Sequence, residues 1–339
     1  MYKTAVVGCG RIGSLFDFDK KNKIIRSHCG AYTNLQNTIL TTICDIDLKK
    51  AKKAKEQWNI DSYYSDHIEM LDKEDIDILS ICTHPDSHEK IVNDAVNSGV
   101  KAIFCEKPIS YNMDSALKIL ELCKSNNIKL AINHSRRWDP YFINLKNEII
   151  NKKFGTLQHI NFYYTRGIAN TGSHLFDLLR YLFGEIISLN AISSIKEIKG
   201  DPTISCTLEM ENGLLCNLIG LDGRYYRIFD LEIFGSKSKI SIDTSKRAKL
   251  FSSTPSKRSS EFNELYEITD DKKTIENSET IISSVTNIIE CIEGRNEINC
   301  SGIDGYKSLE LILAAVLSNK MNKKITLPLE KKHFTFSIQ

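Results

Sequence analysis

The residues with the clearest chemical potential stand at the end of an apolar run. In segment 101–110, KAIFCEKPIS, four apolar residues are followed by Glu106, Lys107 and Pro108. Proline ends strand pairing because it has no N–H group, so the charged pair is expected at the carboxyl edge of a sheet. Open α/β sheets build their ligand sites at that edge. Taken alone, an exposed ion pair at a strand end, contributing well under about 1 kcal/mol, is the alternative.

A second stretch, YYTRGIANTGSHLFDLLRYLFGE at 163–185, combines a histidine with the start of a helix. Ser173 is predicted to cap this helix, and His174 and Asp177 lie three residues apart on one of its faces. The helix dipole disfavours a protonated imidazole at this end, which suits a general base. A simple capping pair of His174 with Asp177 is the alternative interpretation.

The glycines of VVGCGRIG follow an apolar run directly and have the G-x-G-x-x-G spacing. Gly8 permits a tight turn, Gly10 lets the backbone approach a pyrophosphate, and Gly13 allows close packing of helix and strand. The amides at the helix start would then bind the phosphates. A glycine-rich turn without a ligand is the alternative.

The second predicted strand ends at Asp45, where this fingerprint places a carboxylate for the adenosine ribose. A carboxylate there repels the 2′-phosphate of NADP, so the cofactor is predicted to be NAD. Asp47 is a rival that lies past the strand end. The polar segment 16–30 lengthens the chain between Gly8 and Asp45, and we expect it to form a flap beside the cofactor.

The elements that position these residues change character along the chain. Up to residue 135, short apolar runs alternate with helical stretches, which predicts a doubly wound parallel sheet. After about residue 150, alternating strands and a hairpin around Glu-Asn-Gly predict an α+β domain with a large, open, mostly antiparallel sheet. The expected strands are 3–8, 39–45, 76–83, 101–106, 129–133, 157–166, 204–220 (a hairpin) and 226–243; the expected helices are 48–58, 86–98, 113–126 and 304–322; the expected loop is 252–264.

These patterns predict two domains. Residues 1–135 form an NAD-binding Rossmann domain, against which the helix at 304–322 packs back. Residues 136–339 form a substrate-binding and oligomerisation domain. Apolar residues on both faces of the strands within 204–243, such as Leu214, Leu215, Leu218 and Ile219, predict a homodimer or homotetramer through the open sheet face.

Composition narrows the class of protein. The 339 residues are 41% hydrophobic and 26% charged, with a net charge of +2 spread along the chain, so neither a membrane nor a nucleic acid is an expected partner. Ten cysteines include no C-x-x-C pair, and most lie in predicted strands or helices. No metal site is expected, and a reducing cytoplasm is the simplest compartment, because the first residues enter a strand without a secretory signal.

Taken together, five motifs resemble the Gfo/Idh/MocA oxidoreductase family: GCGRIG at 8–13, THPDSH at 83–88, EKP at 106–108, NHSRRWDPY at 133–141 and NTGSHLFD at 170–177. The resemblance implies that Lys107 lies at the nicotinamide beside the reacting carbon, that His174 is the base, and that Glu106 orients Lys107 or touches the cofactor. The residues it implies for cofactor binding are Gly8, Gly10, Arg11, Ile12, Gly13, Asp45, Thr83, His84, His88, Glu106 and Lys107.

One position departs from that pattern. Many family members have an aspartate four residues before the histidine, where this chain has Asn170. An amide can orient a sugar hydroxyl but cannot accept its proton, so the proton path is left to Lys107 and His174.

Arg136, Arg137 and Arg166 carry guanidinium groups, which bind carboxylates and phosphates well. The expected substrate is therefore an acidic sugar or nucleotide sugar rather than free inositol. The predicted function is NAD-dependent oxidation of a sugar or nucleotide-sugar hydroxyl in carbohydrate or surface-polysaccharide metabolism. Surface ion pairs are the alternative role for the arginines. A non-catalytic sensor of NAD or sugar, or a dehydrogenase of inositol, another polyol or a non-sugar substrate, are the alternative functions. The predicted substrate-binding residues are Arg136, Arg137, Tyr164, Arg166, Asn170 and Asp177.

Overall fold

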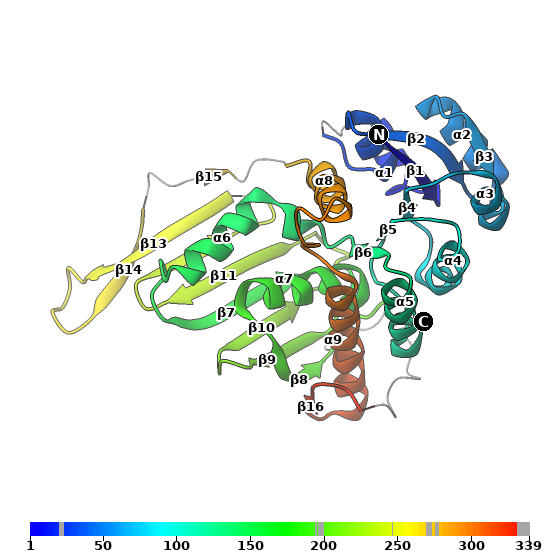
Figure 1. Ribbon diagram of the computed structural model, residues 1–339. Helices are drawn as coiled ribbons and strands as arrows, with labels where there is room; N and C mark the ends of the chain where they lie inside the picture. Colours follow the sequence, from blue (N-terminus) through cyan, green and yellow to red (C-terminus); the bar gives the residue numbers. More distant parts are fainter. Residues whose placement is uncertain are drawn as a thin grey trace. The chain divides into compact units, whose positions relative to one another are not determined.

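The fold is described from a computed structural model, shown in Figure 1. The structure describes residues 1–19, 24–193, 195, 200–245, 247–268, 273–274 and 278–330. The chain divides into two compact units, the first made of Met1–Asp139 and Ser278–Leu309, the second of Pro140–Asn277 and the residues from Glu310 on. Each unit has its own sheet.

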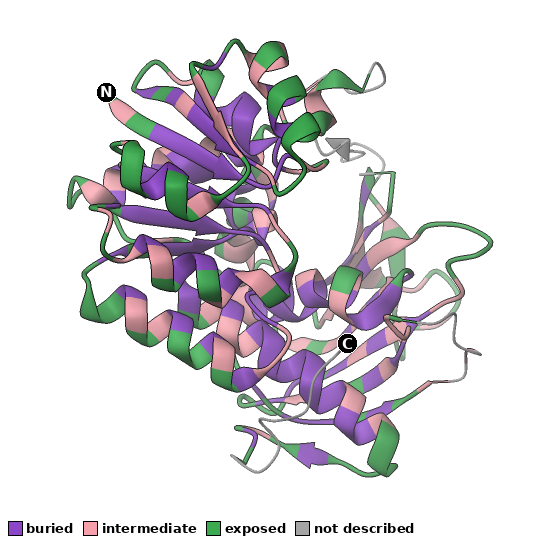
Figure 2. Ribbon diagram, turned by 90° about the vertical axis from the view of Figure 1, so that its right-hand side faces the viewer, coloured by how far each residue is buried: buried purple, intermediate pink, exposed green. Residues whose placement is uncertain are grey.

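The first unit contains a parallel sheet of six strands among the described residues, in the order β3-β2-β1-β4-β5-β6. All of β4 and β5 is buried, and Figure 2 shows the sheet's strands largely in the buried colour, because helices cover both faces. The predicted doubly wound parallel sheet is confirmed. Its strands are β1 (Tyr2–Val7), β2 (Thr38–Cys44), β3 (Ser62–Tyr64), β4 (Ile78–Ile81), β5 (Ala102–Cys105) and β6 (Lys129–Ile132).

Several helices of this unit begin at side-chain caps that the sequence supplies. Asp47 accepts the amide of Lys49 at the start of α2, and Asn112 accepts that of Ser115 at the start of α5. The helices are α1 (His28–Asn34), α2 (Leu48–Trp58), α3 (His67–Lys73), α4 (His88–Ala95), α5 (Met113–Ser125) and α8 (Thr280–Ile292), with short 3-10 turns η1 (Leu15–Phe18), η2 (Pro85–Ser87) and η3 (Ser135–Trp138).

The helix expected directly after the glycine-rich loop is interrupted. The amide of His28 donates to the carbonyl of Ile12, and that of Cys29 donates to Gly13, both at 3.0 Å. In an uninterrupted helix the amides of residues 16 and 17 would make these two bonds. Here His28 and Cys29 make them, so the chain makes an excursion, which includes η1, between Gly13 and α1. This excursion corresponds to the polar segment 16–30 of the sequence. Its residues 20–23 lie outside the described residues, so the predicted flap remains a prediction.

The first unit also contains residues from the C-terminal part of the chain. Helix α8 and the first residues of α9 (Gly302–Met321) join the first unit, which therefore contains a segment from the predicted domain 136–339. The reason is the apolar stripe of α8, which packs against α1, β6 and η3 with Ile281, Val285 and Ile288 buried. The residues of α9 after Leu309 belong to the second unit.

The second unit contains a mixed, mostly antiparallel sheet in the order β14-β13-β12-β11-β7-β10-β9-β8-β16, with β15 beside β13. Among the described strands of this second sheet only the β7–β10 pair is parallel, and β9 and β10 form the predicted hairpin. The strands are β7 (Leu157–Tyr164), β8 (Ile186–Ile192), β9 (Ser205–Met210), β10 (Leu215–Gly220), β11 (Phe229–Gly235), β12 (Ser238–Ile242), β13 (Arg247–Pro255), β14 (Asn263–Glu267), β15 (Lys273–Thr274) and β16 (Ile325–Thr326).

Two local predictions for this unit are wrong. The tract 252–264 was expected to be a loop, but it includes the end of β13 and the start of β14, which pair with each other at the sheet edge. Ser173 was expected to cap a helix, but it is the first residue of α7 (Ser173–Phe183). A π-helical segment, η4 (Gly167–Gly172), precedes it.

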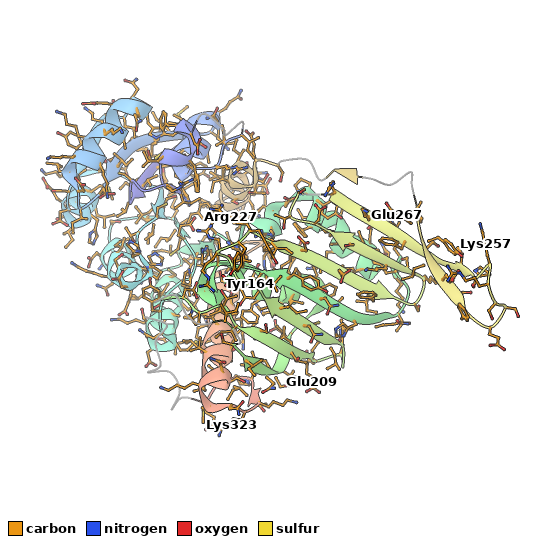
Figure 3. All side chains as sticks on the ribbon, turned by 180° about the vertical axis from the view of Figure 1, so that it is seen from behind. Tyr164, Glu209, Arg227, Lys257, Glu267 and Lys323 are labelled. Atoms are coloured by element: carbon orange, nitrogen blue, oxygen red, sulfur yellow. The ribbon has the colours of Figure 1, made fainter. Side chains whose placement is uncertain are left out.

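The two faces of this sheet differ. Helices α6 (Pro140–Ile150) and α7 lie over one face (Figure 1), toward which Ile160, Phe162 and Tyr164 of β7 are buried. Figure 3 views the sheet from behind, where the described strands lie in front with their side chains displayed. Across this open face, Asn217 contacts His159 at 2.9 Å, and Thr207 contacts Asn217 at 3.2 Å.

Among the described residues, no helix has both the length and the apolar character that a membrane span requires.

Candidate active site

The three glycines of the first loop perform separate structural tasks. Gly8 has a φ of +101°, and a Cβ there would lie 2.6 Å from the carbonyl oxygen of Cys82 at the end of β4. A Cβ at Gly13 would lie 2.0 Å from the carbonyl oxygen of Gly8. A Cβ at Gly10 would meet nothing within 4 Å. Gly8 and Gly13 therefore close the turn, while Gly10 leaves its outer side open to a phosphate group.

The structure separates the two candidate carboxylates at the end of β2. Asp45 Oδ2 accepts the amide of Cys9 at 2.8 Å, which ties it to the glycine-rich loop, and its Oδ1 accepts the amide of Asp47 at 2.9 Å. Asp47 accepts the amide of Lys49 at 3.0 Å and caps α2. Asp45 is thus the carboxylate placed beside the loop, and Asp47 has a capping role.

The other predicted cofactor loops lie in the same unit. The guanidinium carbon of Arg11 is 4.7 Å from the centroid of the Phe16 ring, at the base of the excursion. Ile12 and Thr83 are half-buried, and His84 is exposed. With the end of β5, these loops gather at the carboxyl ends of the parallel strands, the edge where such sheets bind ligands.

His88 has no exposed surface and is held between two loops. Its Nδ1 lies 3.1 Å from the carbonyl oxygen of Ile109, and its Nε2 lies 3.2 Å from that of Thr83. Burial lowers the pKa of His88, so the ring is neutral and donates its single proton to one of the two carbonyls. The prediction that His88 contacts the cofactor is therefore corrected: the ring positions the Thr83 loop against the loop after Lys107.

Glu106 points into the core rather than to solvent. Its Oε1 accepts the side-chain amide of Asn133 at 2.6 Å and lies 3.1 Å from Nε2 of His28. Burial raises the pKa of Glu106, but the hydrogen bonds from His28 and Asn133 and the attraction to His28 and Lys107 outweigh it and leave that pKa lowered. Glu106 is therefore ionised, and the half-buried Lys107 follows it directly at the end of β5.

Three residues around Glu106 escaped the sequence analysis. His28, Ser80 and Asn133 are all buried. His28 of α1 and Asn133 after β6 contact the carboxylate, and Ser80 of β4 lies 2.7 Å from Nδ1 of His28. Asn133 stands inside one of the quoted motifs, so it could have been assigned a role. His28 opens a short helix after a polar insertion, and nothing local to it indicates that it reaches β5.

In the second unit, His174 is the second residue of α7. Its Nδ1 atom is buried, while the ring as a whole is half-exposed. Asp201 anchors the segment before it: its carboxylate accepts the amides of Ala169 at 2.8 Å and Asn170 at 2.7 Å. The side chain of Asn170 is exposed, and Asp177 is buried. Asp201 was also missed, because its contact crosses thirty-one residues of sequence.

Two of the predicted substrate residues have structural roles instead. The hydroxyl of Tyr164 donates to the carbonyl of Ile204 at 2.7 Å and accepts its amide at 2.9 Å, in a fully buried position. Arg137 forms a 2.9 Å ion pair with Asp304 and donates to the carbonyl of Asn299. Because both side chains are buried and have hydrogen-bond or ion-pair partners within the protein, neither is available to a substrate. Arg136 is half-buried and Arg166 is exposed.

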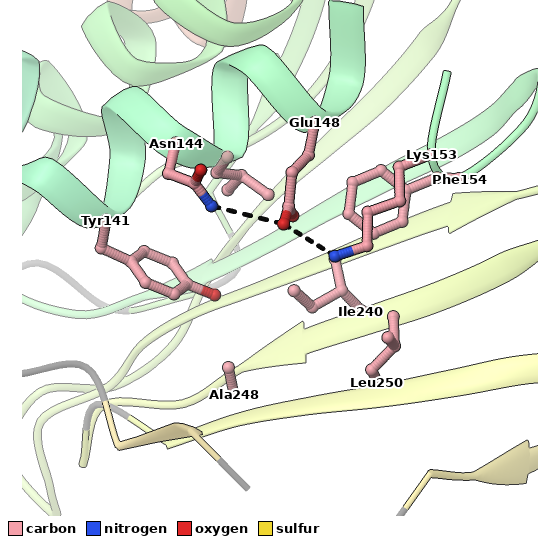
Figure 4. A pocket seen from close by; sticks show the side chains of 9 residues that line it. Tyr141, Asn144, Glu148, Lys153, Phe154, Ile240, Ala248 and Leu250 are labelled. Carbon is pink, nitrogen blue, oxygen red and sulfur yellow. Dashed lines mark hydrogen bonds and ion pairs between the residues drawn. The ribbon is translucent and has the colours of Figure 1, made fainter. Parts of the chain in front are cut away.

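A pocket of about 90 Å³ in the second unit lies apart from every predicted site residue. It is found between α6 and strands β12 and β13 (Figure 4). Glu148 accepts from Lys153 at 2.7 Å and from Asn144 at 3.3 Å within it, over the apolar side chains of Ile240 and Leu250. No group of three His, Cys, Asp or Glu side chains in the described part of the chain could hold a metal ion.

Comparison with known proteins assigns both parts of the chain to one family. Residues 2–134 match the oxidoreductase family Gfo/Idh/MocA, described as an NAD-binding Rossmann fold. Residues 168–327 match the C-terminal α/β domain of the same family.

Individual relatives are similar over nearly the full length. The chain is 24% identical to inositol 2-dehydrogenase from Rhizobium meliloti, covering 95% of this chain and 98% of the relative. It is 23% identical to D-apiose dehydrogenase from Paraburkholderia graminis, covering 96% and 90%. The structure of the WlbA dehydrogenase from Bordetella pertussis in complex with NADH and UDP-GlcNAcA superposes with a TM-score of 0.76 at 19% identity, covering 97% of this chain and 99% of that one.

Proposed function

Because the chain belongs to the Gfo/Idh/MocA oxidoreductase family and its first unit is that family's NAD-binding Rossmann domain, we propose that it oxidises a hydroxyl group of a sugar or nucleotide sugar. The observation that carries this proposal is the pair Glu106–Lys107. It places an ionised carboxylate and a lysine at the end of β5, on the sheet edge that also holds the open side of Gly10 and the carboxylate of Asp45. Carbohydrate or surface-polysaccharide metabolism is the proposed setting.

The residues present fit NAD. The open side of Gly10 gives the backbone room to approach a pyrophosphate, and Asp45 offers carboxylate oxygens for the ribose hydroxyls of adenosine. Arg11, Ile12, Thr83 and His84 are the further contacts we propose. When bound, NAD supplies a nicotinamide C4 that accepts hydride from the carbon being oxidised.

Lys107 and His174 divide the work on the substrate hydroxyl in this proposal. The ammonium of Lys107 donates a hydrogen bond to the oxygen and stabilises the negative charge that develops there. His174, at the start of α7, accepts the hydroxyl proton in this proposal, since an imidazole is the commonest general base in enzymes. Glu106 stays in the core and orients Lys107, while Asn170 and Asp177 are proposed to bind or orient other hydroxyls.

The relatives support a carbohydrate or polyol substrate, and this chain's own arginines refine the class. Of the arginines predicted to bind the substrate, Arg136 and Arg166 remain as candidates to bind a carboxylate or phosphate, which favours an acidic sugar or nucleotide sugar. Inositol or another polyol is the second candidate, since one full-length relative is an inositol 2-dehydrogenase. The comparisons do not favour a sensor without activity. The ten buried cysteines support the cytoplasm as the proposed compartment.

A substrate panel tests the proposal. The protein is incubated with NAD and, separately, nucleotide sugars, uronic acids, neutral sugars and inositols, and reduced nicotinamide is followed by absorbance. We expect the highest kcat/KM with an acidic sugar or nucleotide sugar, and Arg166→Ala to raise KM for that substrate more than for inositol. If NAD is reduced with inositol alone, the second candidate is supported. If NAD is reduced with no compound of the panel, both candidates are contradicted.

Cofactor preference is expected to depend on Asp45. NAD should bind at least about tenfold more tightly than NADP, because the carboxylate faces the 2′-phosphate with like charge. Asp45→Ser should narrow this gap, as measured by fluorescence titration with both reduced cofactors. Asp47→Ser is the matched control, since serine keeps the cap of α2 while one carboxylate is removed. Equal binding of NADP to the wild type would contradict the role given to Asp45.

A homodimer or homotetramer is also proposed, formed through the open face of the second sheet. Leu215, which is 49% exposed, lies on β10 of this sheet. Leu215→Arg is expected to weaken assembly, whereas Ile150→Arg, a 63% exposed position at the end of α6, is expected to leave it intact. Sedimentation velocity at micromolar concentration measures both. A wild-type protein that sediments only as a monomer would refute this proposal.

A further inference from the structure

The helical segment that carries His174 does not begin at α7. It begins at η4, where Arg166 and Gly167 have left-handed φ angles of +75° and +80°, and continues directly into α7. A helix leaves the amides of its first turn without partners inside the helix, and the side chain of Arg166 does not cap this one. The amides of residues 167–170 must therefore find acceptors elsewhere in the chain.

The segment 201–203 supplies an acceptor for each of these four amides. Two of the acceptors are the carboxylate oxygens of Asp201, which thus binds two successive amides of η4. The four bonds are Gly167 to Oγ1 of Thr203 (3.1 Å), Ile168 to the carbonyl of Pro202 (2.7 Å), Ala169 to Oδ1 of Asp201 (2.8 Å) and Asn170 to Oδ2 of Asp201 (2.7 Å). The first turn is therefore capped completely, by residues distant in sequence.

The chemistry of a carboxylate fits this position. Each oxygen of Asp201 accepts one amide, and an ionised carboxylate offers two acceptors and no donor. Its negative charge also lies at the positive end of the helical segment. A Cβ at Gly167 would lie 2.1 Å from Oδ2 of Asp201, so glycine leaves the room that this close approach requires. An asparagine side chain in the same place would turn an NH2 group toward one of the two N–H groups.

The segment that contains Asp201 is itself anchored to the sheet. The hydroxyl of Tyr164, the last residue of β7, donates to the carbonyl of Ile204 at 2.7 Å and accepts the amide of Ile204 at 2.9 Å. This hydroxyl belongs to a fully buried side chain, which is labelled in Figure 3. Asp201 therefore connects η4 to a fixed point of the second unit.

The cap lies about one helical turn from His174. Asn170, whose amide Asp201 binds, stands four residues before His174, and its carbonyl accepts Oγ of Ser173 at 3.1 Å. We propose that Asp201 is a positioning residue for His174. By binding the amides of η4 it fixes the turn from which α7 starts, and so the direction in which the imidazole is presented. This inference rests on the proposed role of His174 in oxidation.

The first test asks whether Asp201 acts through His174. Asp201→Asn keeps the size of the side chain but replaces one acceptor with a donor. We expect kcat to fall by roughly 10–100-fold, the cost of a small misplacement of a reacting group. The affinity for NADH, measured by fluorescence titration, should not change, because the cofactor is proposed to bind the first unit. In a His174→Ala protein the same substitution should lower the residual rate by less than about twofold, since no base remains to be misplaced.

Asp243→Asn is the matched control in the same unit. The carboxylate of Asp243 also accepts a backbone amide, that of Arg247 at 3.1 Å, and pairs with the guanidinium of Arg247 at 2.9 Å, between β12 and β13. This substitution removes a capping carboxylate that does not contact η4, so kcat should equal that of the wild type. If Asp201→Asn does not fold, Asp201→Ser, whose hydroxyl oxygen accepts one amide, takes its place in the same comparison.

A second readout needs no substrate. Diethyl pyrocarbonate acylates imidazole nitrogens, and mass spectrometry follows its reaction with His174, with His159 of β7 as the reference in the same samples. In the wild type Nδ1 of His174 is buried and the ring is half-exposed. Loss of the cap should open the first turn and expose that edge of the ring, so we expect His174 to react at least about threefold faster in Asp201→Asn and at the wild-type rate in Asp243→Asn.

The outcomes separate this inference from the proposed function. If the wild type oxidises no substrate, yet His174 reacts faster in Asp201→Asn alone, the proposed function fails and the positioning role stands. An unchanged reaction of His174 in a folded Asp201→Asn protein overturns the positioning role, even if kcat falls. A full additional loss of rate in the His174→Ala protein, or an equal loss of kcat in Asp243→Asn, shows a general effect on the unit and also overturns it.

Discussion

Replacing Lys107 with methionine is expected to lower turnover by about 10²–10³-fold, the usual cost of removing one preorganised donor from a developing oxyanion. Methionine keeps most of the length and apolar stem of lysine but cannot donate a hydrogen bond. The affinity for NAD should change little, because the groups proposed to hold its phosphates and ribose, Gly10 and Asp45, lie on other loops of the same unit. Stopped-flow measurement of nicotinamide reduction and a separate cofactor titration distinguish the two effects.

Lys101→Met is the matched control for this substitution. Lys101 stands just before β5, and its exposed ammonium pairs with Asp77 at 2.6 Å, away from Glu106. Removing it is expected to leave turnover unchanged and to cost at most about 1 kcal/mol of stability, since exposed ion pairs contribute little. If Lys107→Met oxidises the substrate as fast as Lys101→Met, the role given to Lys107 is wrong.

The parallel sheet of the first unit could be predicted closely because its signals are local. Strands β1, β4 and β5 are short apolar runs bounded by polar residues, and the helix predicted over 48–58 has those bounds in the structure. Strand β3 and helix α3 were missed, since three half-buried residues and a seven-residue helix give too short a pattern.

Site residues that depend on distant partners could not be predicted in the same way. The role of His28 depends on Glu106, seventy-eight residues away, and on a helix that resumes after an excursion. Sequence spacing also cannot say which of two adjacent arginines is buried: Arg137 meets Asp304 from the far end of the chain. Tyr164 is different, because the alternation in β7 that buries Ile160 and Phe162 already places Tyr164 on the same face.

The second large effect is expected at His174. His174→Ala should lower turnover by about 10²–10⁴-fold at neutral pH, the usual contribution of a positioned general base. The residual rate should climb with pH, because hydroxide then takes the substrate proton in place of the imidazole. His159→Ala, a histidine on the sheet of the same unit that contacts Asn217, is the control and should keep the wild-type profile.

Replacing Asn170 with aspartate tests how far the proton path depends on His174 alone. Its amide is held by Asp201 and its side chain is exposed, so Asn170→Asp adds a carboxylate without disturbing the backbone that leads into α7. If His174 is the base, the added negative charge should stabilise its protonated form and shift the acid limb of the kcat/KM profile to higher pH. The same substitution made in the His174→Ala protein should leave the rise of its residual rate with pH intact, since no imidazole remains to be stabilised. A His174→Ala protein with the turnover of the wild type, or a pH profile that Asn170→Asp does not move, would refute His174 as the base and leave the proton to a route through Lys107.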